Sequence, residues 1–167
     1  MKSLWTKWMA LLFVLSLLVS CGGGGGGGGG GGTGDTMTIT IGTNAPITYN
    51  GNASDPILTA KVITTKTYIN LASGYSLAAS SWAKTLNITI NGTTSGTYPF
   101  TSATDPTGIL YSDVPNTYQG TNGTITIAIG AVGSPITGTF NATLLCGTGC
   151  TGTTITMSGS FSVTRSQ

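Results

Sequence analysis

The sequence predicts an all-β domain, either an antiparallel β-sandwich or a partly closed barrel. Apolar and small polar residues alternate along most of the chain, which is the period-2 pattern of a strand with one buried face. No segment keeps the 3.6-residue period of an amphipathic helix. Residues that tolerate positive φ or preset a turn separate the alternating runs, at Asn91-Gly92, Asn122-Gly123 and Gly133-Ser134-Pro135. We therefore expect short strands joined by tight turns.

The chain begins with the three parts of an export signal. Two lysines supply the basic start, and an apolar run from Met9 to Val19 follows them. The third part is the small residue at the end of this run. That run is too short to span a bilayer, which needs about 20 apolar residues. The run Leu18-Val19-Ser20-Cys21 resembles the lipobox of bacterial lipoproteins, in which an aliphatic residue and small residues precede an obligatory cysteine. The resemblance implies that residues 1–20 are removed as a signal peptide and that Cys21 is acylated, which gives the protein a membrane partner.

A run of glycines from Gly22 to Gly32 follows the cysteine. Glycine buries no side chain and loses the most backbone entropy on ordering, so we expect residues 21–34 to form a lipidated cysteine with a flexible tether. The glycines reach roughly 18 Å as a coil. A glycine directly after the cysteine resembles the signal that sends Gram-negative lipoproteins to the outer membrane. The expected location is therefore the outer membrane, with the periplasmic and surface leaflets both open.

Residues 35–167 make up the one predicted domain, and its first half is the less regular. Two runs alternate cleanly, TMTITI at 36–41 and KTLNITIN at 84–91. Between them, residues 57–72 predict a strand and a partial second strand. Residues 73–85 predict a loop, an edge strand or a short helical turn.

The second half gives clearer predictions. GTYPF at 96–100 predicts an edge strand, because Pro99 cannot donate to a sheet ladder. A long loop and one more strand near 109–112 follow. Three alternating runs then predict a three-stranded meander, at residues 123–130, 136–145 and 153–165. The last two runs form a hairpin with CGTGC at its tip.

Cys146 and Cys150 remain as a pair if Cys21 is acylated. In an exported, oxidising compartment such a pair favours a disulfide. Their spacing at a hairpin tip allows the Cα atoms to approach to the separation of about 4.4–6.8 Å that the bond requires. A redox-active pair and a metal site are the alternatives. The metal site is the weaker of the two, because no other thiol or imidazole completes it.

Charge is almost absent from the predicted domain. The charged residues are Lys61, Lys66, Lys84 and Arg165 against Asp35, Asp55, Asp105 and Asp113. Without a basic patch, we expect no nucleic-acid partner. The chain has no histidine and no glutamate, so we expect a non-enzymatic protein with no catalytic residues, no cofactor and no metal. Asp55 and Asp105 each precede a proline, where a carboxylate ordinarily accepts from the amides of a turn.

Aromatic side chains in the irregular middle form the candidate ligand platform. They are Trp82, Tyr75, Tyr98, Tyr111 and Tyr118. Aromatic faces stack on the C–H surfaces of sugars without needing charge, so a glycan or a protein is the expected ligand. The alternative is that these rings fill the core beneath long loops, with their hydroxyls reaching water.

Two further functions are open at this point. The strand at 36–41 directly follows the tether, so the protein could be an adhesin or fibre subunit that donates this strand to a neighbour's sheet edge. Threonines at the outward strand positions resemble the ladders of some ice-binding faces. Threonine is also the polar β-branched residue that an uncharged strand needs, and the unequal strands make ice binding the less favoured function.

The C-terminal run SPITGTFNATLL…GTTITMSGSFSVTR resembles a family of small bacterial lipoproteins of uncharacterised function, common among Bacteroidota. Their last hairpin carries I-[ST]-G-T-F followed by T-I-T-x-x-x-G-x-F, and LNITINGTTSGTYPF is similar to their middle strands. The resemblance implies an all-β lipoprotein and brings no active-site residues. Within these motifs we expect Gly138 and Gly159 to mark a bulge or a close backbone approach. The expected function is a lipid-anchored, non-enzymatic binding or structural module of the cell envelope.

Overall fold

The structure is a computed structural model that describes residues 34–52, 54–77, 80–150 and 152–167. The predicted signal peptide, Cys21 and the glycine tether lie outside these residues. The strands of the described chain are β1 (Thr36–Ile41), β2 (Ile47–Asn50), β3 (Ile57–Ile63), β4 (Lys66–Ser76), β5 (Ser81–Ile90), β6 (Gly96–Phe100), β7 (Gly108–Asp113), β8 (Asn116–Ile129), β9 (Pro135–Thr148) and β10 (Thr154–Thr164). No helix long and apolar enough to cross a bilayer occurs in the described part of the chain.

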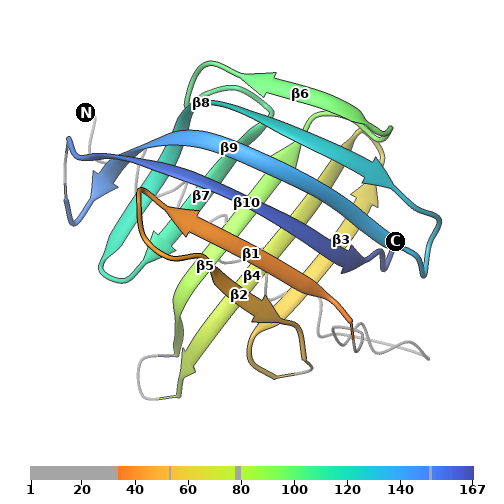
Figure 1. Cartoon of the computed structure of the whole chain (residues 1–167), viewed down its shortest axis with the longest axis horizontal. Coiled ribbons are helices and arrows are strands. Elements are labelled where there is room, and N and C mark those ends of the chain that lie inside the picture. Colours follow the sequence, from red (N-terminus) through yellow and green to blue (C-terminus); the bar gives the residue numbers. More distant parts are fainter. Residues whose placement is uncertain (1–33, 53, 78–79, 151) are drawn as a thin grey trace.

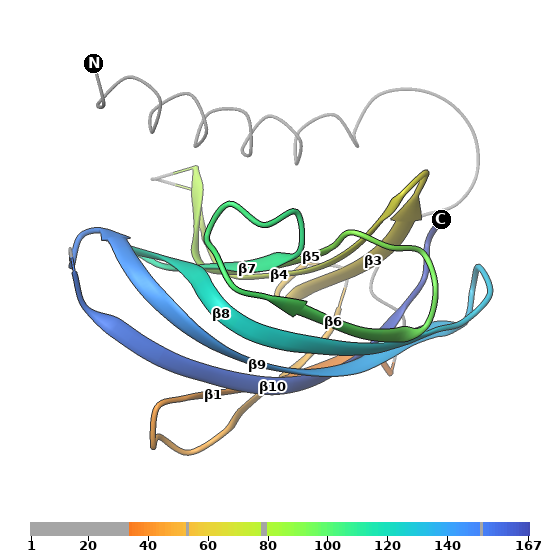
Figure 2. The ribbon, with the colours of Figure 1, turned by 90° about the horizontal axis from the view of Figure 1, so that it is seen from above.

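The strands form one antiparallel sheet that curls on itself, in the order β2-β1-β10-β9-β8-β7-β5-β4-β3, with β6 paired to β8. The sheet turns at strand β8, which pairs with strands of both layers. One of its sides pairs with β9, while the other pairs first with β7 and then with β6. As a result β8, β9, β10 and β1 form a bowed layer, which β7, β5, β4 and β3 cross obliquely (Figure 1, Figure 2). The prediction of an all-β sandwich or partly closed barrel is confirmed.

The C-terminal residues join β10 to the edge strand β3. Beyond β10 the chain leaves β1 and runs beside β3. There the Ser166 amide donates to the Ala60 carbonyl oxygen at 2.9 Å, and the Val62 amide donates to the Gln167 carbonyl oxygen at 3.0 Å. These bonds close the barrel at this one corner.

Asp35 is buried at the same corner, directly before β1. Its carboxylate accepts hydrogen bonds from the backbone amide of Thr164 at 2.9 Å and from the Thr164 hydroxyl at 2.7 Å. Its carbonyl oxygen accepts from the Gly51 amide at 2.8 Å. A buried carboxylate is stable only with such partners, so Asp35 ties the start of β1 to the end of β10.

Aliphatic side chains from both layers fill the space between them. The largest fully buried side chains are Phe100, Met37, Leu58, Ile69, Leu71, Leu86, Ile88, Ile90, Ile125, Ile136, Leu144 and Met157. Each such side chain contributes about 1.5–3 kcal/mol of burial free energy. Most inward positions predicted from the alternation are buried, while Ile41, Ile129 and Ile155 are only partly so.

Two glycines opposite phenylalanines lock the β9–β10 pair. In the register, Phe140 lies opposite Gly159 and Phe161 lies opposite Gly138. A Cβ on Gly159 would lie 2.6 Å from Phe140 Cζ, and a Cβ on Gly138 would lie 2.6 Å from Phe161 Cζ. The expected close approach at these glycines is therefore present, and the approaching atoms include the aromatic rings of the neighbouring strand.

Two sequence predictions about local structure need adjustment. Asn122-Gly123 is no turn, because it lies inside β8, where the register with β9 shifts between Gly120 and Asn122. This bulge lets one strand serve both layers. Residues 73–85, for which a loop, an edge strand or a helical turn was expected, instead belong mostly to β4 and β5. The predicted C-terminal meander is confirmed as β8, β9 and β10.

Candidate functional site

The hairpin tips that join β4 to β5, β7 to β8 and β9 to β10 lie toward the left of Figure 1, whereas β1 begins and the chain ends at the right. The register agrees, because β1 starts opposite Ser162 and ends opposite Met157, toward the β9–β10 hairpin. We call the end with these tips the distal end. It lies away from the point where the chain enters the domain.

Six side chains on the inner face of the distal end form what we call the distal cluster. Its members are Tyr75, Trp82, Lys84, Tyr111, Asp113 and Tyr118. Cross-strand pairing brings them together two by two, because directly opposite residues share one face of a sheet. The pairs are Tyr75 with Trp82, Lys84 with Asp113, and Tyr111 with Tyr118.

The aromatic pairs differ in exposure. The rings of Tyr75 and Trp82 lie 4.9 Å apart between centroids and are tilted by 54°, and Tyr75 is 46% exposed. The rings of Tyr111 and Tyr118 stack at 6.0 Å with 28° between their planes, and Tyr111 is only 3% exposed. The first pair therefore offers an accessible aromatic surface, while Tyr111 closes the core beneath it.

An ion pair lies between these aromatic pairs. Lys84 Nζ is 2.6 Å from Asp113 Oδ2, and the two side chains are 34% and 41% exposed. The Tyr111 hydroxyl donates to the same carboxylate oxygen at 3.3 Å. Both charged groups remain open to solvent and are held on strands, so they present fixed donors and acceptors beside the aromatic surface.

Two tyrosines of this region resist ionisation. Burial raises the pKa of the Tyr111 phenol far above its ordinary value, and the negative charge of Asp113 raises it further. Burial also raises the pKa of Tyr49 on β2, while Lys84 acts to lower it and Asp113 to raise it. Tyr49 thus lies within electrostatic reach of the distal cluster. Both phenols stay protonated near neutral pH and act as neutral hydrogen-bonding groups.

The sequence-based platform is largely assembled here. Trp82, Tyr75, Tyr111 and Tyr118 all belong to the distal cluster, although burial makes Tyr111 part of the core rather than of an open surface. Tyr98 is not brought to it. Its strand is β6, its hydroxyl donates to the Thr94 carbonyl oxygen at 2.7 Å, and its ring covers Gly92.

Sequence reasoning missed Lys84, Asp113 and Tyr49. A usable signal was present for the first two. Lys84 follows Trp82 by two residues and Asp113 follows Tyr111 by two, so in strands each charge shares a face with an aromatic residue. No comparable signal connects Tyr49 to them, because β2 reaches the cluster only through the curl of the sheet.

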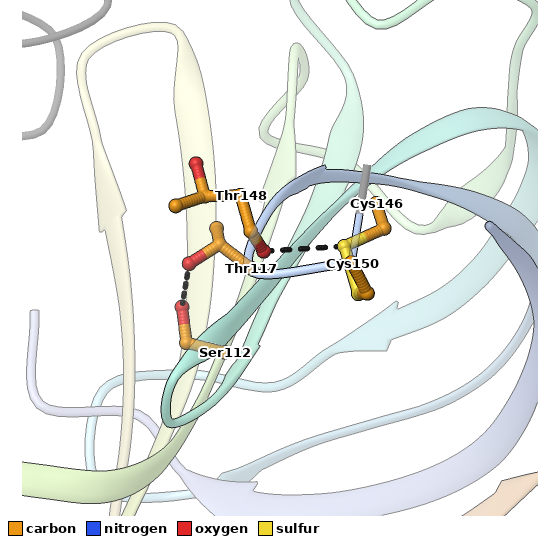
Figure 3. The surroundings of a disulfide bond; sticks show 5 residues. All are labelled: Ser112, Thr117, Cys146, Thr148 and Cys150. Atoms are coloured by element: carbon orange, nitrogen blue, oxygen red, sulfur yellow. Dashed lines mark hydrogen bonds between the residues drawn. A yellow bond between two sulfur atoms is a disulfide. The ribbon is translucent and has the colours of Figure 1, made fainter. Parts of the chain in front are cut away.

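The predicted disulfide between Cys146 and Cys150 is confirmed, with the two Cα atoms 5.6 Å apart (Figure 3). Cys146 lies opposite Tyr118 in the β8–β9 register. Within the disulfide loop, Gly149 packs so closely that a Cβ there would lie 2.9 Å from the Pro115 carbonyl oxygen and would overlap the side chain of Asn116. The loop therefore braces the β7–β8 turn, next to the distal cluster.

Of the two Asp-Pro sequences, Asp105 takes the expected turn role, whereas Asp55 bonds to the strand β4. Both carboxylate oxygens of Asp55 lie 3.0 Å from the Gly74 amide, which donates to them. Asp105 Oδ2 accepts from the Thr101 amide at 2.6 Å and from the Ser102 amide at 3.1 Å. Asp105 therefore fixes its own loop, and Asp55 ties the start of β3 to β4.

Comparison of the chain with protein-family models, with curated proteins and with solved structures found no match.

Proposed function

We propose that the protein is a lipid-anchored lipoprotein of the cell envelope that acts as a non-enzymatic binding module, with the distal cluster as its binding surface and a glycan as its ligand. One observation carries this proposal. A Tyr75–Trp82 pair, in which Tyr75 is exposed and Trp82 half-buried, and a solvent-open Lys84–Asp113 pair share one face at the end of the domain remote from the chain's entry.

The chemistry of the distal cluster suits a sugar better than an apolar or strongly charged ligand. A sugar ring presents C–H groups on one face and hydroxyls around its edge. The aromatic pair provides the stacking surface. The ammonium and carboxylate provide charge-assisted hydrogen bonds to hydroxyls, and their opposite charges cancel, so no net charge is demanded of the ligand. Mouths of β-barrels are also common ligand sites.

The anchoring part of the proposal is supported by the sequence. The basic start, the short apolar run and Leu18-Val19-Ser20-Cys21 together have the pattern of a lipoprotein signal. Two or more acyl chains on Cys21 would hold the protein firmly, because each buried methylene contributes about 0.8 kcal/mol. A tether entering at β1 would then leave the distal end directed away from the bilayer.

The fibre alternative has less support. Strand β1, the expected donor, pairs with β10 on one side and with β2 on the other within its own sheet. Donation would require it to leave both partners and to free Asp35 from Thr164. No observation favours that exchange over the closed monomer.

The ligand is testable with the full chain and a panel of neutral polysaccharides. Affinity electrophoresis should show retention that Trp82→Ala weakens at least tenfold, which corresponds to about 1.4 kcal/mol. Tyr68→Ala is the matched control, because Tyr68 lies on β4 like Tyr75 but on the opposite face. Retention that survives Trp82→Ala unchanged, or the absence of retention by every polysaccharide, would contradict the glycan proposal.

The location is testable by protease treatment of intact cells that carry an epitope tag after Gln167. Loss of the tag from intact cells indicates the surface leaflet, and loss only after permeabilisation of the outer membrane indicates the periplasmic leaflet. Replacement of Cys21 by serine should release the protein from the membrane fraction. If the protein stays in that fraction after the replacement, the lipid anchor is refuted.

A further inference from the structure

The bowed layer, together with β2 paired to β1 and β6 paired to β8, has an outer face unlike the distal cluster. The six strands β1, β2, β6, β8, β9 and β10 contain no Asp, Glu, Lys or Arg within their described bounds. One row of side chains crosses all six strands and consists only of hydroxyl residues, namely Thr48, Thr38, Ser160, Thr139, Thr126 and Thr97. Hydrogen bonds of 3.0 Å and 3.1 Å join the two residues at each end of the row.

A groove of about 250 Å³ crosses the same face nearer the distal end. One wall is the row Asn122, Thr143 and Thr156, and the other wall is the row Asn141, Ser158 and Thr40. The two rows lie two residues apart along each strand, which separates them by about 7 Å. Gly123, Ala142 and Met157 lie between the rows and form the floor. We call this hollow the outer groove.

Two carboxamides give the outer groove its hydrogen-bonding capacity. Asn122 and Asn141 are both exposed, and across the described residues neither side chain is held by a hydrogen bond to protein. Each carboxamide offers two donors and one acceptor oxygen. They lie on adjacent strands and on opposite walls, so a molecule in the groove can reach both. The hydroxyls of Ser158 and Thr156, also exposed, extend the same chemistry to β10.

These properties define the ligand class. A charged ligand finds no opposite charge on any of the six strands, and an apolar ligand finds polar walls. A neutral polyhydroxylated chain can exchange hydrogen bonds with both carboxamides and with the wall hydroxyls. The groove runs across the strands, which repeat about every 4.8 Å, so it can follow an extended polymer.

The outer groove and the distal cluster lie on opposite faces of the sheet. On β8, Tyr118 belongs to the inner face, whereas Asn122 and Thr124 belong to the outer one. A ligand segment at one site is therefore separated from the other site by the sheet itself. Two sites arranged in this way hold two separate segments at once, which raises the apparent affinity for a long polymer by linkage.

We propose that the outer groove binds a second segment of the neutral polysaccharide, so that one molecule of this protein bridges two glycan chains. This inference rests on the proposed function of the distal cluster. It adds a second site, its ligand class and a physical role, the cross-linking of polysaccharide in the cell envelope.

The test uses the full chain at one copy per nanodisc, so that bridging cannot arise from several copies in one micelle. Dextran, mannan and a neutral β-glucan serve as probes, and dynamic light scattering reports the size of the polysaccharide particles. Wild-type protein should enlarge the particles of the polysaccharide it binds. A large excess of protein should reverse this, because separate protein molecules then cover each polysaccharide chain and none bridges two chains.

The double variant Asn122→Ala/Asn141→Ala should abolish this enlargement and weaken binding to the long polymer by about 100-fold, while a short oligosaccharide still changes Trp82 fluorescence. The matched control is Thr137→Ala/Ser162→Ala, which removes two hydroxyls from the same face and strands outside the groove. Unchanged bridging by the asparagine variant would overturn this inference alone. Absence of any fluorescence change or retention with wild-type protein would overturn the proposed function as well.

Discussion

The ten strands divide into six that carry no charge and four, β3, β4, β5 and β7, that carry Lys61, Lys66, Lys84 and Asp113. In the four charged strands, the inward aliphatic residues are followed by Tyr111 and then by the Lys84–Asp113 pair toward the distal end. In the uncharged strands, phenylalanines lie opposite glycines instead.

This difference shows two ways of fixing strand register. A shift of one residue would turn every inward side chain outward, so each half needs a feature that opposes it. In the uncharged half that feature is shape, since Phe140 and Phe161 each need the space over a glycine. In the charged half, that feature is the Lys84–Asp113 ion pair together with the hydrogen bond from Tyr111 to Asp113, which form in the observed register at the distal end.

The largest expected effect is a loss of stability in the uncharged strands when the space over a glycine is filled. Gly159→Ala should lower the free energy of unfolding by about 3 kcal/mol, because overpacking forces neighbours to move. Its Cβ would overlap the Thr38 carbonyl oxygen and crowd Phe140. Gly147→Ala, also in this half, is the control, since no heavy atom lies within 4 Å of its Cβ. Urea unfolding measures both, and equal midpoints would refute the idea that glycine space fixes this register.

The next largest effect is expected at the disulfide loop, which contacts the turn between β7 of the charged half and β8 of the uncharged half. Cys146→Ser/Cys150→Ser should cost about 2 kcal/mol, because the cross-link closes a small loop. Hydrogen exchange should also speed up around Asn116, since the disulfide loop braces the β7–β8 turn. Thiol titration of the untreated protein should find neither cysteine reactive. A variant with wild-type exchange at this turn would show that the loop and the turn are independent.

Alkaline pH should weaken the fold around the distal cluster. Burial raises the pKa of Tyr111 and of Tyr49, so the folded protein holds these protons more tightly than the unfolded chain, whose tyrosines ionise near pH 10. The resulting stability is fully present below pH 10 and is lost as the pH rises above it. Thermal unfolding between pH 8 and about pH 11 should show this decline. Tyr111→Phe should flatten it, and a decline in this variant as steep as that of the wild type would contradict the assignment.

The smallest effect is expected at the ion pair. A double-mutant cycle of Lys84→Met and Asp113→Asn should give a coupling free energy of about 0.5 kcal/mol or less, because both side chains are more than a third open to solvent. High salt should reduce it further. The same variants should weaken polysaccharide retention clearly. A coupling well above 1 kcal/mol would contradict this expectation and show that the pair contributes to stability more strongly than its exposure allows.

Much of the fold was predictable because alternation is a local property. The strands at 36–41, 84–91 and from 123 onward follow from period-2 patterns, and the disulfide follows from cysteine spacing. Asn122-Gly123 was misread because a bulge and a tight turn ask for the same residues, and only the pairing with β9 distinguishes them.

The candidate site was predictable only in part. Trp82, Tyr75, Tyr111 and Tyr118 were identifiable as aromatic residues outside the regular runs. Their grouping depends on which strands become neighbours, and in particular on β5 pairing with β7 rather than with β6. The outer groove depends on the alignment of β8, β9 and β10, so no single stretch of sequence contains it.

The attachment of Asp35 also determines how the domain withstands mechanical load. If the protein holds a polymer at its distal end, as we propose, it is pulled between that polymer and the chain ahead of β1. Such tension acts along β1, whose hydrogen bonds to β10 and β2 then resist sliding together rather than opening one after another. The grip of Asp35 on Thr164 lies first in the path of the force. Resistance to pulling is governed by the unfolding rate, so loss of this carboxylate should shorten the time for which the domain stays folded under load.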